Sequence, residues 1–123
     1  MGCTGKFVAV VDDDASVARS TARLLHAAGI AAETFASGDA FLARMQAAAA
    51  YCPACVILDV CMPGTSGLEV QRRLAGLRLP LIFITAHEWP EARDRALAGG
   101  AVGYLRKPFD ARQLIGMVRR VMQ

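Results

Sequence analysis

Short apolar runs recur along the chain and alternate with longer stretches in which apolar and polar residues mix. Runs of this length, bounded by turn-forming residues, predict β-strands. The expected strands cover residues 7–11, 30–35, 55–59, 80–85 and 101–105. The run at 30–35 is the least apolar of these, so we expect that strand to lie at an edge of a sheet.

The stretches between the runs have apolar residues at the spacing of an amphipathic helix, about 3.6 residues per turn. The first expected helix covers residues 15–28, and the others begin near residues 37, 66, 90 and 110. Ser37 and Asp110 fit N-cap positions, and Ser66 with Glu69 fits a capping box. The face of the first helix that we expect to be buried comprises Val17, Thr21, Leu24, Leu25 and Ala28.

Repeated alternation of strand and helix with short connections predicts a parallel sheet with right-handed crossovers. The continuously apolar runs at 7–11, 55–59 and 80–85 need cover on both faces, as the central strands of such a sheet have. We therefore predict one doubly wound α/β domain over residues 1–123, without a second domain. In sheets of this class, binding sites lie beyond the carboxyl ends of the strands.

Four of the predicted strands end in side chains suited to a metal ion or a phosphate. The residues at these ends are Asp12, Asp13, Asp59, Thr85 and Lys107. Three carboxylates at one edge of a sheet repel one another unless a cation lies among them. Hard oxygen ligands without His or Cys select Mg²⁺ or Mn²⁺ over zinc. We therefore expect an acidic metal site.

The same residues suit phosphoryl chemistry. A carboxylate at such a site can attack phosphorus and become an acyl phosphate. Lys107 would supply a point cation to a phosphoryl oxygen, and Thr85 would supply a hydroxyl donor. Together these residues predict that Asp59 accepts a phosphoryl group in a metal-assisted reaction.

Each of these residues also has an ordinary structural interpretation. Asp12, Asp13 and Asp14 suit the cap of a helix, and Asp59 suits a turn. Thr85 is a common residue in strands, and Lys107 could be a solvated lysine. Only their occurrence together at four strand ends favours a functional site.

Composition and charge narrow the classes of function. A length of 123 residues with 54% hydrophobic residues suits one domain with a sizeable core. The net charge is +3, and the basic residues are spread along the chain, whereas a nucleic-acid-binding surface requires clustering. The chain contains no apolar run of about 18 residues, and its first residues lack the layout of a secretory signal. We therefore expect a cytoplasmic protein with neither DNA nor membrane as a direct partner.

The chain contains four cysteines, of which Cys52 and Cys55 form a C-x-x-C motif. A redox pair of the thioredoxin type follows a strand and opens a helix, but this motif precedes a predicted strand. Zinc would need two more ligands at matching spacing, and the sequence offers no second pair. We therefore expect reduced, unreactive thiols.

Four segments carry the residues singled out above. They are Val11-Asp12-Asp13-Asp14, Leu58-Asp59-Val60-Cys61-Met62-Pro63-Gly64, Ile84-Thr85-Ala86 and Lys107-Pro108-Phe109. These segments resemble the motifs of response-regulator receiver domains of two-component signalling, most of all receivers attached to helix-turn-helix transcription regulators. The resemblance covers nearly the whole chain and implies a flavodoxin-like (βα)5 fold with strand order 2-1-3-4-5. It also implies that the chain is a receiver domain without its output domain.

The resemblance assigns a role to each site residue. Asp59 would accept a phosphoryl group from the phosphohistidine of a sensor histidine kinase or a phosphotransfer protein. The implied ligands of Mg²⁺ (or Mn²⁺) are Asp12, Asp13, Asp59 and the backbone carbonyl of Cys61. Thr85 and Lys107 would contact the phosphoryl group, and the Lys107–Pro108 bond would be cis. Thr85 and Tyr104 would form the switch.

Cys61 and His87 lie two residues after Asp59 and Thr85, respectively. In the family, side chains at these two positions line the route of the water that attacks the acyl phosphate. Neither residue is the acid or amide that best orients such a water, so we hypothesise slow self-dephosphorylation. The alternative is that both positions are neutral.

Phosphorylation would shift the population between two preformed states. The fourth helix, fifth strand and fifth helix would then change shape and could bind a second copy of the chain or an output domain. The residues expected on this face are Trp89, Tyr104, Arg106, Arg112 and Arg119. The alternative is an ordinary solvated helix face.

Three rival functions remain. A receiver-like interaction module would keep the fold without being phosphorylated, although the intact site residues argue against it. An aspartyl-phosphate phosphohydrolase usually has a second acid two residues after its nucleophile, where this chain has Cys61. A nucleotide- or flavin-binding protein would have a glycine-rich turn after the first strand, where this chain has acids.

Overall fold

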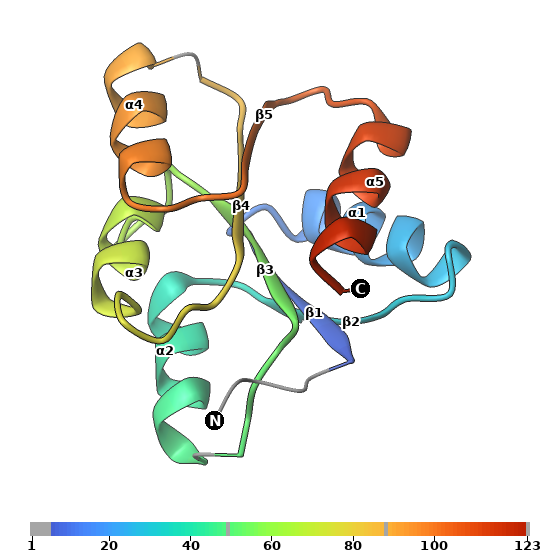
Figure 1. Cartoon of the computed structure of the whole chain (residues 1–123), viewed down its shortest axis with the longest axis horizontal. Coiled ribbons are helices and arrows are strands. Elements are labelled where there is room, and N and C mark those ends of the chain that lie inside the picture. Colours follow the sequence, from blue (N-terminus) through green and yellow to red (C-terminus); the bar gives the residue numbers. More distant parts are fainter. Residues whose placement is uncertain (1–5, 49, 88, 123) are drawn as a thin grey trace.

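The computed structural model describes residues 6–48, 50–87 and 89–122, in which strands and helices alternate strictly (Figure 1). The strands are β1 (Phe7–Val11), β2 (Ala31–Phe35), β3 (Cys55–Asp59), β4 (Leu81–Thr85) and β5 (Gly103–Arg106). The helices are α1 (Ala15–Ala27), α2 (Gly38–Ala47), α3 (Gly67–Arg73), α4 (Pro90–Ala98) and α5 (Ala111–Met122). The predicted alternation of elements is confirmed.

The strands form one parallel sheet with the order β2-β1-β3-β4-β5. This confirms the doubly wound fold, and β2 lies at an edge as expected. The connection after β1 leads to α1 on one face of the sheet, and the connection after β3 leads to α3 on the other. Such a reversal leaves a crevice beyond the carboxyl ends of the two strands, where ligands of this fold class bind.

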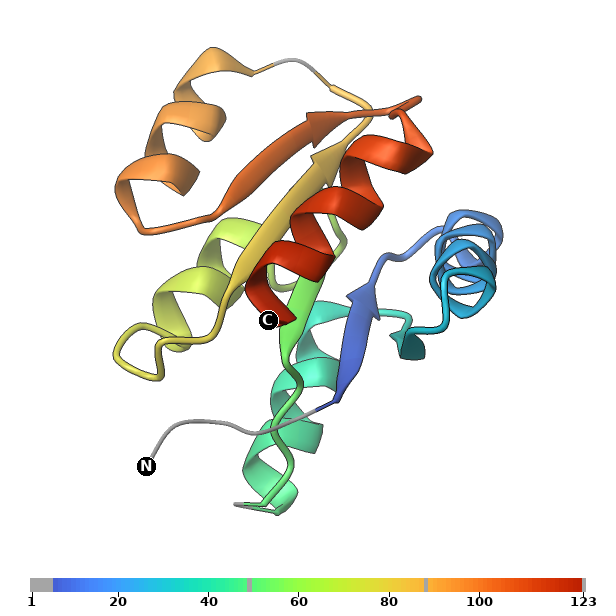
Figure 2. The ribbon, with the colours of Figure 1, turned by 45° about the vertical axis from the view of Figure 1, so that its right-hand side comes forward.

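Helices cover both faces of the sheet, with α1 and α5 on one side and α2, α3 and α4 on the other (Figures 1 and 2). Val8 and Val10 pack in the core cluster of α1 and α5. Ala9 and Val11 pack in the cluster of α2, α3 and α4. Because successive residues of a strand face opposite sides, a strand covered on both faces is apolar throughout. Every residue of β3 and β4 is accordingly buried.

The buried face of α1 differs from the expected one. Thr21 and Leu25 are buried as predicted, but Ala18 and Ala22 are buried as well, whereas Val17 and Leu24 are only partly buried. The small alanine side chains let α1 lie close to the sheet. The larger side chains of Val17 and Leu24 then lie at the margin of the interface between α1 and the sheet. The Thr21 hydroxyl is satisfied because it donates to the Val17 carbonyl at 2.8 Å.

The last strand begins two residues later than expected, at Gly103. The amide of Ala101 donates to the Ala96 carbonyl at 3.0 Å and so helps to close the end of α4. The Ala101 amide therefore bonds to the end of α4 and does not pair with a neighbouring strand.

The predicted helix caps are confirmed, with one difference. The Ser37 hydroxyl accepts from the Ala40 amide at 3.0 Å, and the Asp110 carboxylate accepts from the Arg112 amide at 2.8 Å. Ser66 accepts from the Glu69 amide at 3.2 Å. The Glu69 carboxylate, however, pairs with the two arginines that follow it on α3 and does not complete the capping box.

The cysteines correct one expectation. Cys52 is disulfide-bonded, so the expectation of reduced thiols is wrong for this residue. Cys55 and Cys61 are free, the first buried and the second exposed. The two cysteines of the C-x-x-C motif are therefore not joined to each other, because Cys55 points into the core as the first residue of β3. Burial raises the pKa of the Cys55 thiol to about 12, which makes it unreactive.

Within the described residues, every helix is too short or too polar to cross a lipid bilayer.

Candidate functional site at the carboxyl ends of the strands

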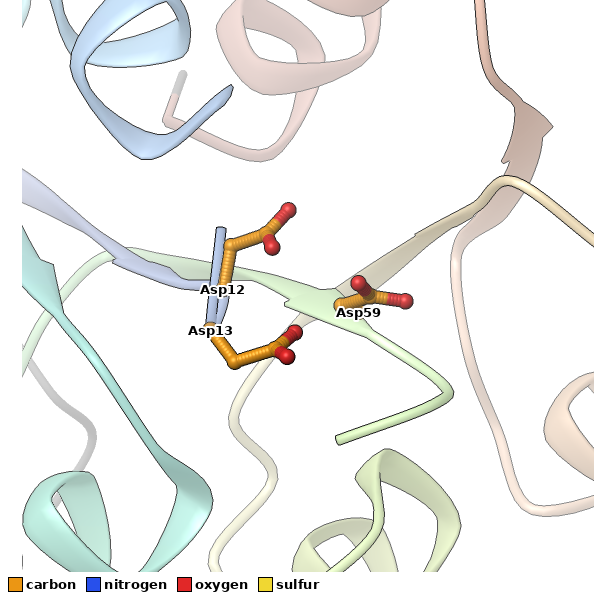
Figure 3. A group of neighbouring side chains, drawn as sticks. All are labelled: Asp12, Asp13 and Asp59. Atoms are coloured by element: carbon orange, nitrogen blue, oxygen red, sulfur yellow. The ribbon is translucent and has the colours of Figure 1, made fainter. Parts of the chain in front are cut away.

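Three carboxylates meet beyond the ends of β1 and β3. Asp12 and Asp13 follow β1, and Asp59 is the last residue of β3. One carboxylate oxygen from each of the three lies within 4.8 Å of the others. In Figure 3, Asp12 and Asp13 extend from the end of β1 toward the side of the site where Asp59 lies. Asp12 is 1% exposed and Asp59 is 6% exposed, so most of this negative charge is removed from water.

Lys107 closes the site from the segment after β5. Its Nζ atom donates to Asp12 Oδ2 at 2.9 Å and to Asp59 Oδ2 at 3.2 Å. Burial by itself disfavours the charged ammonium, but the hydrogen bond to Asp12 and the nearby carboxylates outweigh it and raise the pKa of Lys107. Lys107 is therefore charged at neutral pH and lies between the two buried carboxylates.

The second oxygen of each buried carboxylate is held by the backbone two residues further on. Asp12 Oδ1 accepts from the Asp14 amide at 2.9 Å, and Asp59 Oδ1 accepts from the Cys61 amide at 3.1 Å. Burial raises the pKa of Asp59, and the charge of Lys107 and the Cys61 amide oppose that rise. Both carboxylates are thus fixed in orientation by one local and one long-range hydrogen bond.

The third consecutive acid, Asp14, has a different use. Its carboxylate accepts from the Ser16 and Val17 amides at 3.0 and 3.3 Å and caps α1. Its side chain is therefore turned to the helix end, and only its amide serves the site. Helix capping, which was the structural alternative for Asp12, Asp13 and Asp14, is confirmed for Asp14.

Gly67 shapes the turn after Asp59, and the sequence reasoning gave it no role in the site. A Cβ atom on this residue would lie 2.3 Å from the Asp59 carbonyl oxygen and 2.9 Å from the Val60 Cα atom. The Gly67 amide donates to the Val60 carbonyl at 2.9 Å. The start of α3 therefore packs directly on the backbone that carries Asp59. The signal in the sequence was a glycine directly after a helix N-cap.

Thr85 ends β4 and is completely buried. Its hydroxyl oxygen accepts from the His87 amide at 3.2 Å, and its carbonyl accepts from the Lys107 amide at 2.8 Å. The second bond ties the backbone of Lys107 to the end of the neighbouring strand. The Lys107–Pro108 bond is cis, as the resemblance implied.

Tyr104 lies farther along the sheet, on β5. Its ring centroid is 6.3 Å from that of Phe83, and its hydroxyl is buried with no hydrogen-bond partner among the described residues. Burial raises the pKa of Tyr104, an effect that the charge of Arg93 opposes. Tyr104 lines a cavity of about 300 Å³ between α4 and β5 together with His87 and Arg93.

The structure thus brings together Asp12, Asp13, Asp59 and Lys107 directly, with Thr85 at the next strand end. Cys61 is linked to Asp59 through its amide. Its exposed thiol lies instead along a mostly apolar groove of about 520 Å³ between α3 and α4, together with Leu68 and Trp89. The individual roles of these residues remain predictions.

Comparison with known proteins agrees with this geometry. The response regulator receiver domain family matches residues 8–119. A receiver protein structure from Burkholderia phymatum is 58% identical, with a TM-score of 0.85 and 94% of each chain covered. The structure titled FixJ-N is 31% identical, with a TM-score of 0.83, and the match covers 94% of this chain and 92% of that one.

Curated relatives show the same similarity over part of their length. The response regulator protein TodT of Pseudomonas putida is 36% identical over 116 residues, which is 93% of this chain and 50% of TodT. Nodulation protein W of Bradyrhizobium diazoefficiens is 39% identical over 117 residues, which is 94% of this chain and 50% of that protein. The chain therefore spans about half the length of these relatives. With the family match covering nearly all of the sheet and the helices, the chain belongs to the response-regulator receiver domains of two-component signalling.

Proposed function

We propose that Asp59 accepts a phosphoryl group from the phosphohistidine of a sensor histidine kinase or a phosphotransfer protein. The observation that carries this proposal is the arrangement around Asp59. Its carboxylate lies within 4.8 Å of two further acids and accepts a hydrogen bond from Lys107 at 3.2 Å. Few structural roles require three acids and a lysine from three strand ends to lie together, whereas phosphoryl transfer uses such a set.

The residues present fit a divalent cation. Three carboxylates face one ammonium group, so the positive charge of Lys107 balances only one of the three negative charges. Oxygen donors of this kind suit Mg²⁺ or Mn²⁺. The resemblance to receiver domains implies Asp13 as a direct ligand, and Asp13 is the exposed member of the group. Asp12, Asp59 and the Cys61 carbonyl complete the proposed set. A bound Mg²⁺ would neutralise charge on the transferring group.

In the proposed reaction, a carboxylate oxygen of Asp59 attacks phosphorus, and an O–P bond forms as the N–P bond of the phosphohistidine breaks. The electron pair of that bond returns to the imidazole of the donor. Lys107 contacts one phosphoryl oxygen, and the Thr85 hydroxyl donates a hydrogen bond to another. Water later attacks phosphorus, releases inorganic phosphate and restores the carboxylate. At the two positions that line the route of this water in the family, Cys61 and His87 offer no acid or amide to orient it, so we expect the loss to be slow.

The phosphoryl group then acts as a signal. Thr85 moves toward it, Tyr104 moves into the space that Thr85 leaves, and the face made by α4, β5 and α5 changes shape. That face would bind a second copy of the chain or an output domain of the kind that regulators in this family use. We place the reaction in the cytoplasm, with residues 1–123 acting as one receiver domain and with no direct contact to DNA or membrane.

The test is mass measurement after incubation with acetyl phosphate and Mg²⁺. The wild-type chain should gain one phosphoryl group, and removing Mg²⁺ with a chelator should prevent the gain. Asp59→Asn is the matched control, because it keeps the size of the side chain and removes the nucleophile. A wild-type chain that gains no mass would support the receiver-like interaction module instead, and equal labelling of Asp59→Asn would place the reaction elsewhere.

A further inference from the structure

The loop between β3 and α3 carries the Cys61 carbonyl, which is one of the proposed metal ligands. The Cys61 amide donates to Asp59 Oδ1 at 3.1 Å, and the Gly67 amide donates to the Val60 carbonyl at 2.9 Å. These two bonds hold the first residues of the loop. Among the described residues, the backbone groups of residues 62–65 form no hydrogen bond with another backbone group. The middle of the loop therefore depends on side chains for its order.

Two side chains of this loop connect it to α2. Met62 is buried in the core cluster that also contains Phe41. The Thr65 hydroxyl donates to Asp39 Oδ1, and Asp39 lies in the first turn of α2. Within the described part of the chain, this is the one hydrogen bond that residues 62–65 form. Apolar packing of Met62 is not directional, so the bond to Asp39 is the contact that fixes the loop in one position.

Glycines let the loop and α2 approach each other on both sides of this bond. A Cβ atom on Gly38 would lie 2.9 Å from the Thr65 carbonyl oxygen, and one on Gly64 would lie 2.9 Å from Asp39 Oδ2. Gly64 also has a φ of 76°, which a residue with a side chain rarely adopts. The backbone of the loop is therefore shaped to bring the Thr65 hydroxyl to the Asp39 carboxylate.

We propose that Thr65 is a positioning residue for the divalent cation. Its bond to Asp39 holds the loop against α2 and so keeps the Cys61 carbonyl, earlier in the same loop, in place for the metal. Thr65 touches neither the metal nor a reacting atom in this role. The inference rests on the proposed function, because it needs Cys61 among the ligands. The competing explanation is that the bond contributes only to the stability of the fold.

Order in this loop matters to the metal for two reasons. Mg²⁺ requires nearly ideal octahedral geometry, so a displaced ligand atom is poorly tolerated. A loop that spends part of its time elsewhere lowers the apparent affinity by the fraction of molecules in which it is correctly placed. The proposed movement of Thr85 and Tyr104 belongs to β4 and β5, so the loop can stay in place while the switch moves.

The experiment measures binding of Mn²⁺, whose free ion is counted by electron paramagnetic resonance, with Mg²⁺ as the competitor. Thr65→Val keeps the shape of the side chain and removes the hydroxyl. It should weaken the binding of both ions about two- to tenfold, the range that one hydrogen bond supports. Thr65→Ser keeps the hydroxyl and should bind both ions nearly as tightly as wild type.

Asp39 provides the second half of the test. Asp39→Ala should weaken binding to a similar extent, and combining it with Thr65→Val should weaken binding no further, because both changes remove the same contact. Asp39→Asn keeps an oxygen that accepts and should bind nearly as tightly as wild type. Asp39 is exposed, so solvent and salt screen the effect of its charge on the metal.

Tyr51→Phe is the control for stability alone. It also removes a hydroxyl that donates to a carboxylate, that of Glu33, on the far side of α2 from the loop's contact with Asp39. Denaturant unfolding of the metal-free protein should show a similar loss of stability in Tyr51→Phe and Thr65→Val. The affinity for Mn²⁺ should fall only in Thr65→Val.

The outcomes separate the two proposals. If the wild-type chain binds neither ion, the proposed function fails. If it binds both and Thr65→Val binds them as tightly, only the positioning role fails. Weak binding by Thr65→Ser or by Tyr51→Phe would also overturn that role. Should Thr65→Val fail to fold, the Asp39 variants decide: tight binding by Asp39→Ala, or equally weak binding by Asp39→Ala and Asp39→Asn, contradicts the proposal.

Discussion

The acidic site and the aromatic cluster beside β2 differ in how far their charges are balanced. The aromatic cluster comprises Phe7, Phe35, Phe41 and Tyr51, whose rings pack with centroids 5.3 to 6.4 Å apart. The Arg44 guanidinium lies 4.0 Å from the centroid of the Tyr51 ring, and the Tyr51 hydroxyl donates to Glu33. One cation and one anion thus balance around a tyrosine. At the acidic site, a single lysine faces three carboxylates.

This difference in charge balance suggests that the aromatic cluster contributes to stability and the acidic site to function. Around Tyr51, burial and the Glu33 hydrogen bond raise the pKa of the phenol, so the ring stays neutral and contributes packing. At the acidic site, the three carboxylates repel one another and oppose folding, and a bound cation would offset this repulsion. Substitution of an acid at the site should therefore alter phosphorylation with little loss of stability, and substitutions in the cluster should do the reverse.

The largest effect is expected at Asp59. Asp59→Asn should lower phosphorylation by acetyl phosphate about a thousandfold or more, as loss of a nucleophile does. The melting temperature should not fall, because the change removes one of three clustered negative charges. Mass spectrometry and thermal unfolding measure the two quantities. A variant with a lower melting temperature would show that the Asp59 carboxylate also stabilises the fold.

Phe41→Ala tests the other region. Phe41 is fully buried against Phe35, so its truncation should lower the free energy of unfolding by about 3–5 kcal/mol. Denaturant unfolding measures this loss. Phosphorylation per folded molecule should be unchanged, and a large fall in that rate would contradict the separation of the two regions.

Lys107→Met should give two opposite changes at the acidic site. Phosphorylation should slow about 10- to 100-fold, because the cation that contacts the phosphoryl group is lost. Mg²⁺ should bind more tightly, because the ammonium no longer competes for Asp12 and Asp59. Titration with Mg²⁺ monitored by calorimetry checks the second change. Weaker Mg²⁺ binding would mean that Lys107 organises the carboxylates and does not compete with the metal.

Cys61→Asn sharpens the hypothesis of slow self-dephosphorylation. An amide at this position can orient the attacking water, so loss of phosphate should speed up roughly tenfold, less than full general acid–base catalysis provides. The decay of phosphorylated protein after removal of acetyl phosphate gives the rate. Cys61→Ser is the matched control for loss of the thiol alone. An unchanged rate in the Asn variant would favour the neutral alternative.

The smallest effect is expected from Tyr51→Phe, which removes only a hydroxyl. The loss of its hydrogen bond to Glu33 should lower the free energy of unfolding by about 1 kcal/mol. The ring contacts with Phe7, Phe35 and Arg44 remain. A denaturant midpoint equal to that of wild type would assign the whole contribution of Tyr51 to its ring.

The sequence predicted that the side chains of the acidic site would lie close together, because each residue comes directly at, or just after, the end of a strand; their roles stay predictions. Once the strands are parallel, Asp12, Asp13, Asp59 and Lys107 all lie at the same edge of the sheet. The caps at Ser37 and Asp110 were predictable for a similar reason, because a cap acts within its own helical turn.

Other features could not be predicted, because they depend on packing between distant segments. The periodicity of α1 favoured Val17 and Leu24, whereas close approach to the sheet buried Ala18 and Ala22. The role of Gly67 depends on how closely α3 approaches the backbone of β3. Nothing in the spacing of the cysteines indicated that Cys52 would be disulfide-bonded.

By itself, the sequence determined the order of elements, the parallel sheet and the set of side chains at its carboxyl edge. Those properties follow from local periodicity and from the position of each polar residue relative to its own strand. Only the tertiary structure decided that Lys107 lies between Asp12 and Asp59, that Asp14 caps α1 and that Thr65 donates to Asp39. The contacts of Lys107 and Thr65 depend on distances between side chains that are far apart in the sequence. The linear order of residues does not specify such distances.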